Sequence, residues 1–147
     1  MSPKHVSMAG LAIGAAAILA GCATATPAET PPALIKPVAG SQIPQLQLTE
    51  RAVQRLGIVT QPVRPITTAG QPAREVIPYS AVVYDTDGST WTYVNSAART
   101  YEREPITVAD IEGEAALLSA GPPAGSAVVT VGAAELLGTE YNISGEE

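Results

Sequence analysis

Turn signals recur at short intervals along the second half of the chain, and this spacing constrains the fold more than any other feature of the sequence. Asp87-Gly88 is a favoured hairpin pair, and the run from Gly121 to Gly125 holds two prolines. Apolar and β-branched runs lie between such turns, and Ala127–Val131 is one without interruption, so we expect Val128, Val129 and Val131 in or next to the core. Short strands separated by turn residues at this spacing are typical of a small β-barrel or sandwich. We therefore predict a mainly β fold.

One short helix is expected ahead of these strands. Thr49 can cap it, Glu50 lies in its first turn, and Gly57 is placed to end it. We predict a helix over Thr49–Leu56 and a loop over residues 64–73, while Ala133–Leu137 is either a short helical turn or a strand. The predicted strands are Ile58–Val63, Val76–Tyr84, Thr90–Val94, Arg99–Val108, Glu114–Ser119 and Ala127–Val131.

The composition limits how such a fold can be stabilised. The chain has one cysteine, so no disulfide can form within it. It has no Phe and one Trp, so the core must consist mostly of Val, Ile, Leu, Ala and Tyr. The length supports one domain, which we place at residues 46–147. The two-residue period of a strand puts Trp91 and Tyr93 on one face.

The first 21 residues have the parts of a secretory signal peptide. Lys4 supplies the positive charge, and a run of small and apolar residues follows from Val6 to Ala20. Leu19-Ala20-Gly21-Cys22 resembles a lipobox, which implies cleavage by signal peptidase II between Gly21 and Cys22 and a diacylglyceryl group on the Cys22 sulfur. An ordinary signal peptide is the alternative, whereas the run is shorter than the roughly 20 residues of a transmembrane helix.

Residues 22–45 are rich in proline and small residues. Such a segment buries few apolar groups and has several fixed φ angles. We predict a flexible linker that reaches about 70 Å if it is fully extended as polyproline. Its prolines are Pro27, Pro31, Pro32, Pro37 and Pro44.

Several classes of function are excluded by composition. Removal of residues 1–21, which hold one lysine and no acid, changes the net charge from −6 to −7, which argues against binding to nucleic acid. No polybasic run is present to hold an anionic membrane. The remaining chain has no histidine and no free thiol, which removes the usual triads and zinc sites. We predict that the protein is not an enzyme and has no cofactor or metal site.

The order of the segments carries a resemblance to a known family. The segments that carry it are 48–58, 77–83 (which contains Ala81-Val82), the Asp87-Gly88 pair, 91–94, 105–108, 118–125 and 127–133. In this order they resemble the membrane-proximal region of periplasmic adaptor proteins, also called membrane fusion proteins. Those adaptors insert a lipoyl-like domain, a helical hairpin and a β-barrel between the part that 48–58 resembles and the part that 77–133 resembles. This chain has only residues 64–73 at that point, and it has no heptad run. Pro122 and Ser126 also depart from the family pattern.

Two functions follow as hypotheses. The resemblance implies a lipid-anchored, extracytoplasmic scaffold that is accessory to a membrane transport or efflux complex and contacts a transporter or a larger adaptor. The alternative is a cell-envelope module that binds glycan or a small ligand through hairpin aromatics, with Trp91 and Tyr93 as the contact residues. In both cases the lipid on Cys22 holds the protein at the cell membrane, or at the periplasmic face of the outer membrane in a diderm.

The lipobox leads to a direct test. Changing Cys22 to Ser removes the sulfur that accepts the lipid, so we expect no processing by signal peptidase II and no incorporation of a palmitate analogue. Metabolic labelling of cells that express each form measures this. Label that persists on the Cys22→Ser protein contradicts the lipobox prediction.

Overall fold

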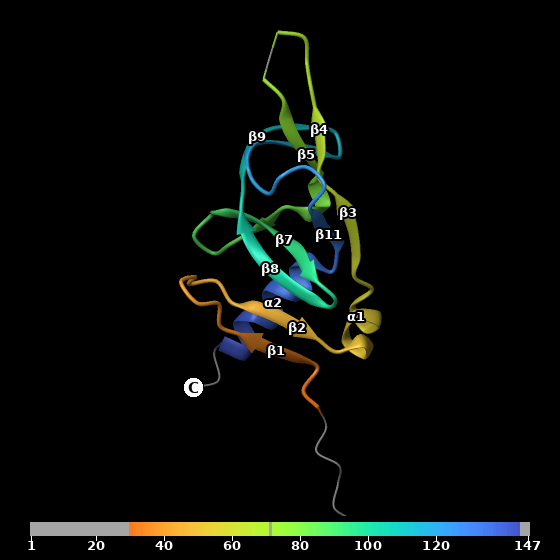
Figure 1. The fold of residues 1–147 in the computed structure, drawn as a ribbon, viewed down its shortest axis with the longest axis vertical. Coiled ribbons are helices and arrows are strands. Elements are labelled where there is room, and N and C mark those ends of the chain that lie inside the picture. The colour runs from red at the N-terminus through yellow and green to blue at the C-terminus, as the bar shows by residue number, and fades with distance from the viewer. Residues whose placement is uncertain (1–29, 71, 145–147) are drawn as a thin grey trace, which may run out of the picture.

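The computed structural model describes residues 30–70 and 72–144, and over this part of the chain the predicted mainly β fold is confirmed. Two sheets form a sandwich-like arrangement, and neither closes into a barrel within the described residues. Figure 1 shows an elongated molecule in which β1, β2 and α1 form one end and the β4–β5 hairpin projects from the other.

The larger sheet, which we call sheet A, has seven strands among the described residues. In spatial order they are β1 (Ala33–Lys36), β2 (Gln45–Leu48), β8 (Thr100–Pro105), β7 (Thr90–Ala97), β11 (Ala127–Val131) and β3 (Val59–Pro62), and β6 (Val83–Tyr84) also pairs with β7. The turn between β6 and β7 closes with the amide of Gly88 donating to the Asp85 carbonyl, and Gly88 has a φ of 84°.

The smaller sheet, sheet B, holds four strands in the order β4 (Arg64–Ile66), β5 (Arg74–Pro78), β10 (Ala115–Ala120) and β9 (Thr107–Glu112). A 3₁₀ turn, η1 (Tyr79–Ala81), connects β5 to β6 and so carries the chain back to sheet A. All the strand pairs in both sheets are antiparallel.

Strand β11 of sheet A has buried residues on both of its faces. Successive residues of a strand point to opposite faces, and Val128 and Val129 on β11 are both fully buried but belong to different cores. Val129 packs in a core with Leu46 and Leu136, whereas Val128 packs in a second core with residues of sheet B. This double burial explains why the Ala127–Val131 run has no charged residue, and its one polar residue, Thr130, is buried and donates to the Val59 carbonyl at 3.3 Å.

The short helix α1 (Glu50–Leu56) is confirmed with the caps that the sequence predicted. The Thr49 hydroxyl accepts a hydrogen bond from the Ala52 amide at 3.2 Å. Gly57 ends the helix with a φ of 61°, in the left-handed region that glycine enters without a steric penalty. Ala52 is the buried residue of this helix and joins the core that contains Leu46.

A second helix, α2 (Ala133–Ser144), extends well beyond the short element that the sequence left open at residues 133–137. Its buried residues are Ala133, Leu136 and Glu140, which are three or four apart and therefore share one face. Gly138 lies in the middle of this helix, where glycine costs about 1 kcal/mol relative to alanine. The helix therefore depends on its packing against β1, β6 and β7.

The predicted linker over residues 22–45 is too long, because β1 lies within it. Ala33–Lys36 pairs with Gln45–Leu48, and Ala33 is buried in the core. The strand forms because its backbone groups find partners on β2, which proline content alone does not reveal. Only residues 23–32 separate Cys22 from β1. The ordered domain therefore begins earlier than the predicted boundary at residue 46.

Two further predictions differ from the structure. Residues 64–73 were expected to be a loop, but Arg64–Ile66 is strand β4, which pairs with β5 at the edge of sheet B. Pro65 is tolerated there because an edge strand need not donate every backbone hydrogen bond. Val131 was expected in or next to the core together with Val128 and Val129, but its side chain is exposed at the end of β11.

Two valines of β11 that differ in burial allow a test of the assigned core. Val129→Asp places an unpaired charge in a fully buried position, so we expect a loss of about 3–5 kcal/mol in the free energy of unfolding. Val131→Asp is the control, because the same change two residues away is exposed and should cost less than about 1 kcal/mol. Urea unfolding measures both, and equal losses contradict the assignment of the core.

Candidate functional site

Trp91 and Tyr93 lie on one face of β7, as the period of the strand predicted, and this face is covered. Tyr93 is fully buried, and its hydroxyl donates to Glu140 on α2 at 2.6 Å. Trp91 is partly buried, and its indole N–H donates to the Ser89 hydroxyl at 2.7 Å. The guanidinium of Arg103 covers the Trp91 ring at 4.5 Å from the ring centre. Neither aromatic ring offers an open platform for a ligand.

Arg103 is the centre of a polar cluster beneath α2. Its guanidinium forms one ion pair with Asp85, in the turn after β6, and a second with Glu140 on α2 at 3.2 Å. The Tyr141 hydroxyl donates to the other oxygen of Asp85. The side chain of Arg103 is only 11% exposed, so two carboxylates offset the cost of burying its charge.

The cluster shifts the titration of its members in directions that follow from these contacts. The hydrogen bond from Tyr141, followed by those from the Thr86 amide and Arg103, lowers the pKa of Asp85 to about 2. Burial, and next the hydrogen bond to Glu140, raises the pKa of Tyr93. Because the pKa of Asp85 is lower in the folded state, its stabilising effect is present above roughly pH 4 and is lost as the pH falls towards 2.

This cluster joins α2 to the sheet, and sequence reasoning missed it. Arg103 and Glu140 are separated by many residues, and α2 itself was not predicted in full. The signal that could have found it is a charged residue on the inward face of a strand. Arg103 lies two residues after the buried Tyr101 and therefore on the same face of β8. Such a residue needs a counter-charge from elsewhere in the fold.

A surface groove forms where the chain passes from sheet A to sheet B. β3 ends at Pro62 and β4 begins at Arg64, with the buried Val63 between them. The Val63 amide donates to the Ser126 carbonyl at 2.8 Å, and its carbonyl accepts from the Gly125 amide at 2.9 Å. Two hydrogen bonds at the end of the Gly121–Gly125 turn thus hold the crossing point. Beyond it, β3 and β5 separate and leave a groove of about 360 Å³.

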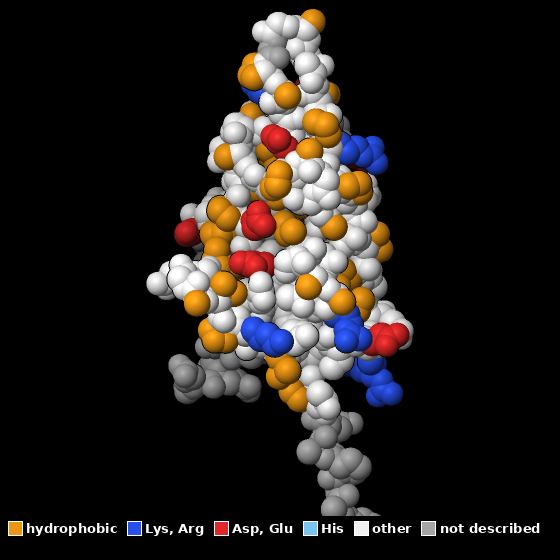
Figure 2. Space-filling model, viewed as in Figure 1, with side chains coloured by type: hydrophobic (Ala, Val, Ile, Leu, Met, Phe, Trp, Pro, Cys, Tyr) orange, Lys and Arg blue, Asp and Glu red, His pale blue; other side chains and the backbone are white. Residues whose placement is uncertain are grey.

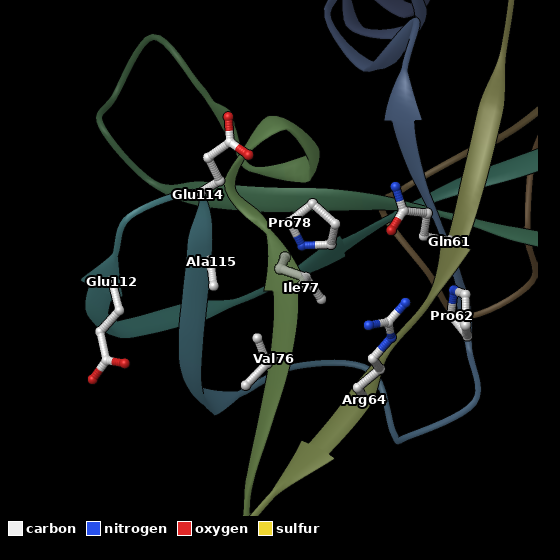
Figure 3. Close-up of a pocket in the computed structure, with 9 residues that line it drawn as sticks. All are labelled: Gln61, Pro62, Arg64, Val76, Ile77, Pro78, Glu112, Glu114 and Ala115. Carbon is white, nitrogen blue, oxygen red and sulfur yellow. The ribbon is translucent and has the colours of Figure 1, made fainter.

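The groove has an apolar floor with charged and polar groups at its sides. Figure 3 shows Ile77 and Pro78 of β5 at its centre, with Arg64 and Gln61 on one side and two glutamates on the other. The residues that line it are Gln61, Pro62, Arg64, Val76, Ile77, Pro78, Glu112, Glu114 and Ala115. A second hollow continues it past Pro78 to Tyr79 and Gly113. The charged side chains among the residues that line it are Arg64, Glu112 and Glu114.

The remaining site predictions fall as follows. Gly21 and Cys22 lie outside the described residues. Asp85-x-Asp87-Gly88 forms a hairpin turn, as expected. In the described ranges 30–70 and 72–144, no group of His, Cys, Asp and Glu could hold a metal ion, and no helix is long and apolar enough to cross a bilayer. The sequence does not predict the groove, because residues 64–73 are expected to be a loop and no local pattern places Glu112 and Glu114 beside β5.

Comparison of the chain with family models, with curated proteins and with solved structures found no match. The resemblance to periplasmic adaptors therefore remains a prediction from the order of the segments.

The Arg103 cluster leads to a test of how α2 is held. Arg103→Met leaves the carboxylates of Asp85 and Glu140 without their shared cation, so we expect the free energy of unfolding to fall by about 3 kcal/mol. Arg64→Met, on an exposed edge strand, is the matched control and should change stability by less than about 1 kcal/mol. Both are measured by urea unfolding at neutral pH. A loss for Arg103→Met no larger than that of the control shows that the cluster does not hold the helix.

Proposed function

We propose that this chain is a lipid-anchored, extracytoplasmic scaffold, similar to the membrane-proximal part of an adaptor and accessory to a membrane transport or efflux complex. The observation that carries the proposal is that the two adaptor-like segments lie in one body. Segment 48–58 leads into β3, and β3 pairs with β11, which lies within the second adaptor-like part, residues 77–133. Where adaptors carry their large inserted domains, this chain has the β4–β5 hairpin.

The shape of the molecule supports a role in which one end is anchored and the other meets a partner. The chain enters at the end formed by β1 and α1, so a lipid on Cys22 would hold that end near the membrane (Figure 1). The β4–β5 hairpin lies at the opposite end and would point away from the bilayer. A transporter or a larger adaptor in the same membrane is the partner that this arrangement fits.

The run from Val59 to Ile66 is the surface that we propose for this contact. It forms the outer edge of sheet A through β3 and of sheet B through β4, and most of its residues are exposed. A free strand edge can pair with a strand of another chain. Pro62 and Pro65 lack amide hydrogens, which limits unspecific pairing, and the groove beside Arg64 adds side-chain contacts.

The alternative function, binding of glycan or a small ligand through Trp91 and Tyr93, has less support. Tyr93 is buried and bonded to Glu140, and the ring of Trp91 is covered by Arg103. A ligand could reach the Tyr93 ring only after α2 had left the sheet, and the covered face of Trp91 only after Arg103 had moved.

Site-specific photo-crosslinking tests the proposed contact. A photoreactive amino acid at Ile66 or Gln61, both exposed on the proposed edge, should give a covalent product with a transporter or adaptor subunit, identified by mass spectrometry. The same group at Glu135, exposed on α2, is the control and should not. If no such subunit is captured at the edge positions, or if Glu135 captures it equally, the proposal is contradicted.

A further inference from the structure

Although the sequence has no polybasic run, basic side chains that are far apart in it gather at one end of the molecule. Lys36 lies on β1, Arg51 and Arg55 on α1, and Arg99 in the turn between β7 and β8, and all four are exposed. Figure 2 shows Lys and Arg side chains over the β1 and α1 end, beside the point where the N-terminal chain leaves the domain. We call these four residues the cationic end.

Backbone contacts hold three of these residues close to the entry of the chain. The Thr49 amide donates to the Pro32 carbonyl at 3.0 Å, which places the start of α1 against the entering strand. The Leu48 amide donates to the Arg99 carbonyl at 2.9 Å, which brings the β7–β8 turn to the same corner. Arg51 and Arg55 are four residues apart on one helix face and line a hollow together with Thr30 and Pro32.

The acidic side chains are distributed differently. Two carboxylates lie near the four basic residues: Glu50, which accepts a hydrogen bond from Gln54 at 3.3 Å, and Glu102, which lies across β2 from Lys36 and accepts one from Gln45 at 2.9 Å. Many of the others lie on β5, in the β6–β7 turn, on β8 and on the β9–β10 hairpin, and these include Glu75, Asp87, Glu104, Asp110, Glu112 and Glu114. Salt screens charges beyond about 8 Å at physiological ionic strength. A surface close to the cationic end therefore meets a positive field although the whole chain carries a net charge of −6.

We infer that the cationic end is a contact surface for anionic phospholipid headgroups and lays this end of the domain on the bilayer. The inference rests on the proposed function in one respect, because the lipid on Cys22 brings the surface to the membrane. The ten residues 23–32 reach at most about 35 Å, so the end of the domain that carries β1 stays close to the headgroups. Each cation near an anionic surface favours contact about fivefold. The groove and the β4–β5 hairpin are then held away from the lipid.

Chemical modification of arginine in the lipidated protein, expressed from the full chain, tests the contact with headgroups. The protein is reconstituted on vesicles of phosphatidylcholine alone or with added phosphatidylglycerol, treated with phenylglyoxal, and analysed by mass spectrometry. We expect modification of Arg51, Arg55 and Arg99 to slow about fivefold on the phosphatidylglycerol vesicles and to recover at high salt. Arg64 and Arg74, in the hairpin at the other end, are internal controls and should be unchanged.

Matched variants show whether the cations act together. Arg51→Gln with Arg55→Gln should abolish most of the protection of Arg99, whereas Arg64→Gln with Arg74→Gln, which removes the same charge, should leave it intact. Equal modification on both kinds of vesicle, or equal slowing at all five arginines, overturns the inference.

Flotation of the protein with the same two kinds of vesicle separates this inference from the prediction of a lipid anchor. Flotation with uncharged phosphatidylcholine vesicles reports the anchor alone, so a protein that fails to float there contradicts the proposed lipidation. Binding to phosphatidylglycerol vesicles, with selective protection of Arg51, Arg55 and Arg99, would still support the cationic end in that case. Absence of the selective protection would overturn the inference whether or not the anchor is present.

Discussion

The guanidinium of Arg103 is the group on which the C-terminal third of this structure depends. A buried cation is costly unless carboxylates meet it, and here one comes from the turn after β6 and the other from α2. These contacts fix the helix at the position where Leu136 and Ala133 complete the core beneath it. In a chain whose only cysteine cannot form an internal disulfide, this cluster provides the long-range connection that a disulfide provides in many small extracytoplasmic domains.

Buried residues on both faces of β11 join the two sheets and the two helices into one elongated body. Neighbouring residues such as Val128 and Val129 serve opposite cores, so neither core can move independently of the central strands. The crossing at Val63 adds a direct covalent path between the sheets. The distance between the β1 and α1 end and the β4–β5 hairpin is therefore set by packing, which is the property that the proposed scaffold would require.

The proposed contact surfaces follow the same long axis. The cationic end lies beside the entering chain, the proposed partner edge runs along β3 and β4, and the hairpin forms the far tip (Figures 1 and 2). An anchor that ties down one point leaves a domain free to tilt, whereas additional contacts by Arg51, Arg55 and Arg99 would restrict it. The two proposals are thus complementary: contact of one end with headgroups orients the edge and the groove towards a neighbouring membrane complex.

The sequence by itself determined the features that depend on a few adjacent residues. The caps of α1 at Thr49 and Gly57, the Asp87-Gly88 turn and the β-branched strands follow from local backbone preferences, and the lipobox prediction is likewise read from a linear motif. Only the tertiary structure decided the rest. β1 forms in a proline-rich segment because β2 supplies its partners, and α2 persists through Gly138 because its other face is buried. The groove and the cationic end combine residues from distant segments, and no local pattern encodes which distant residues will meet.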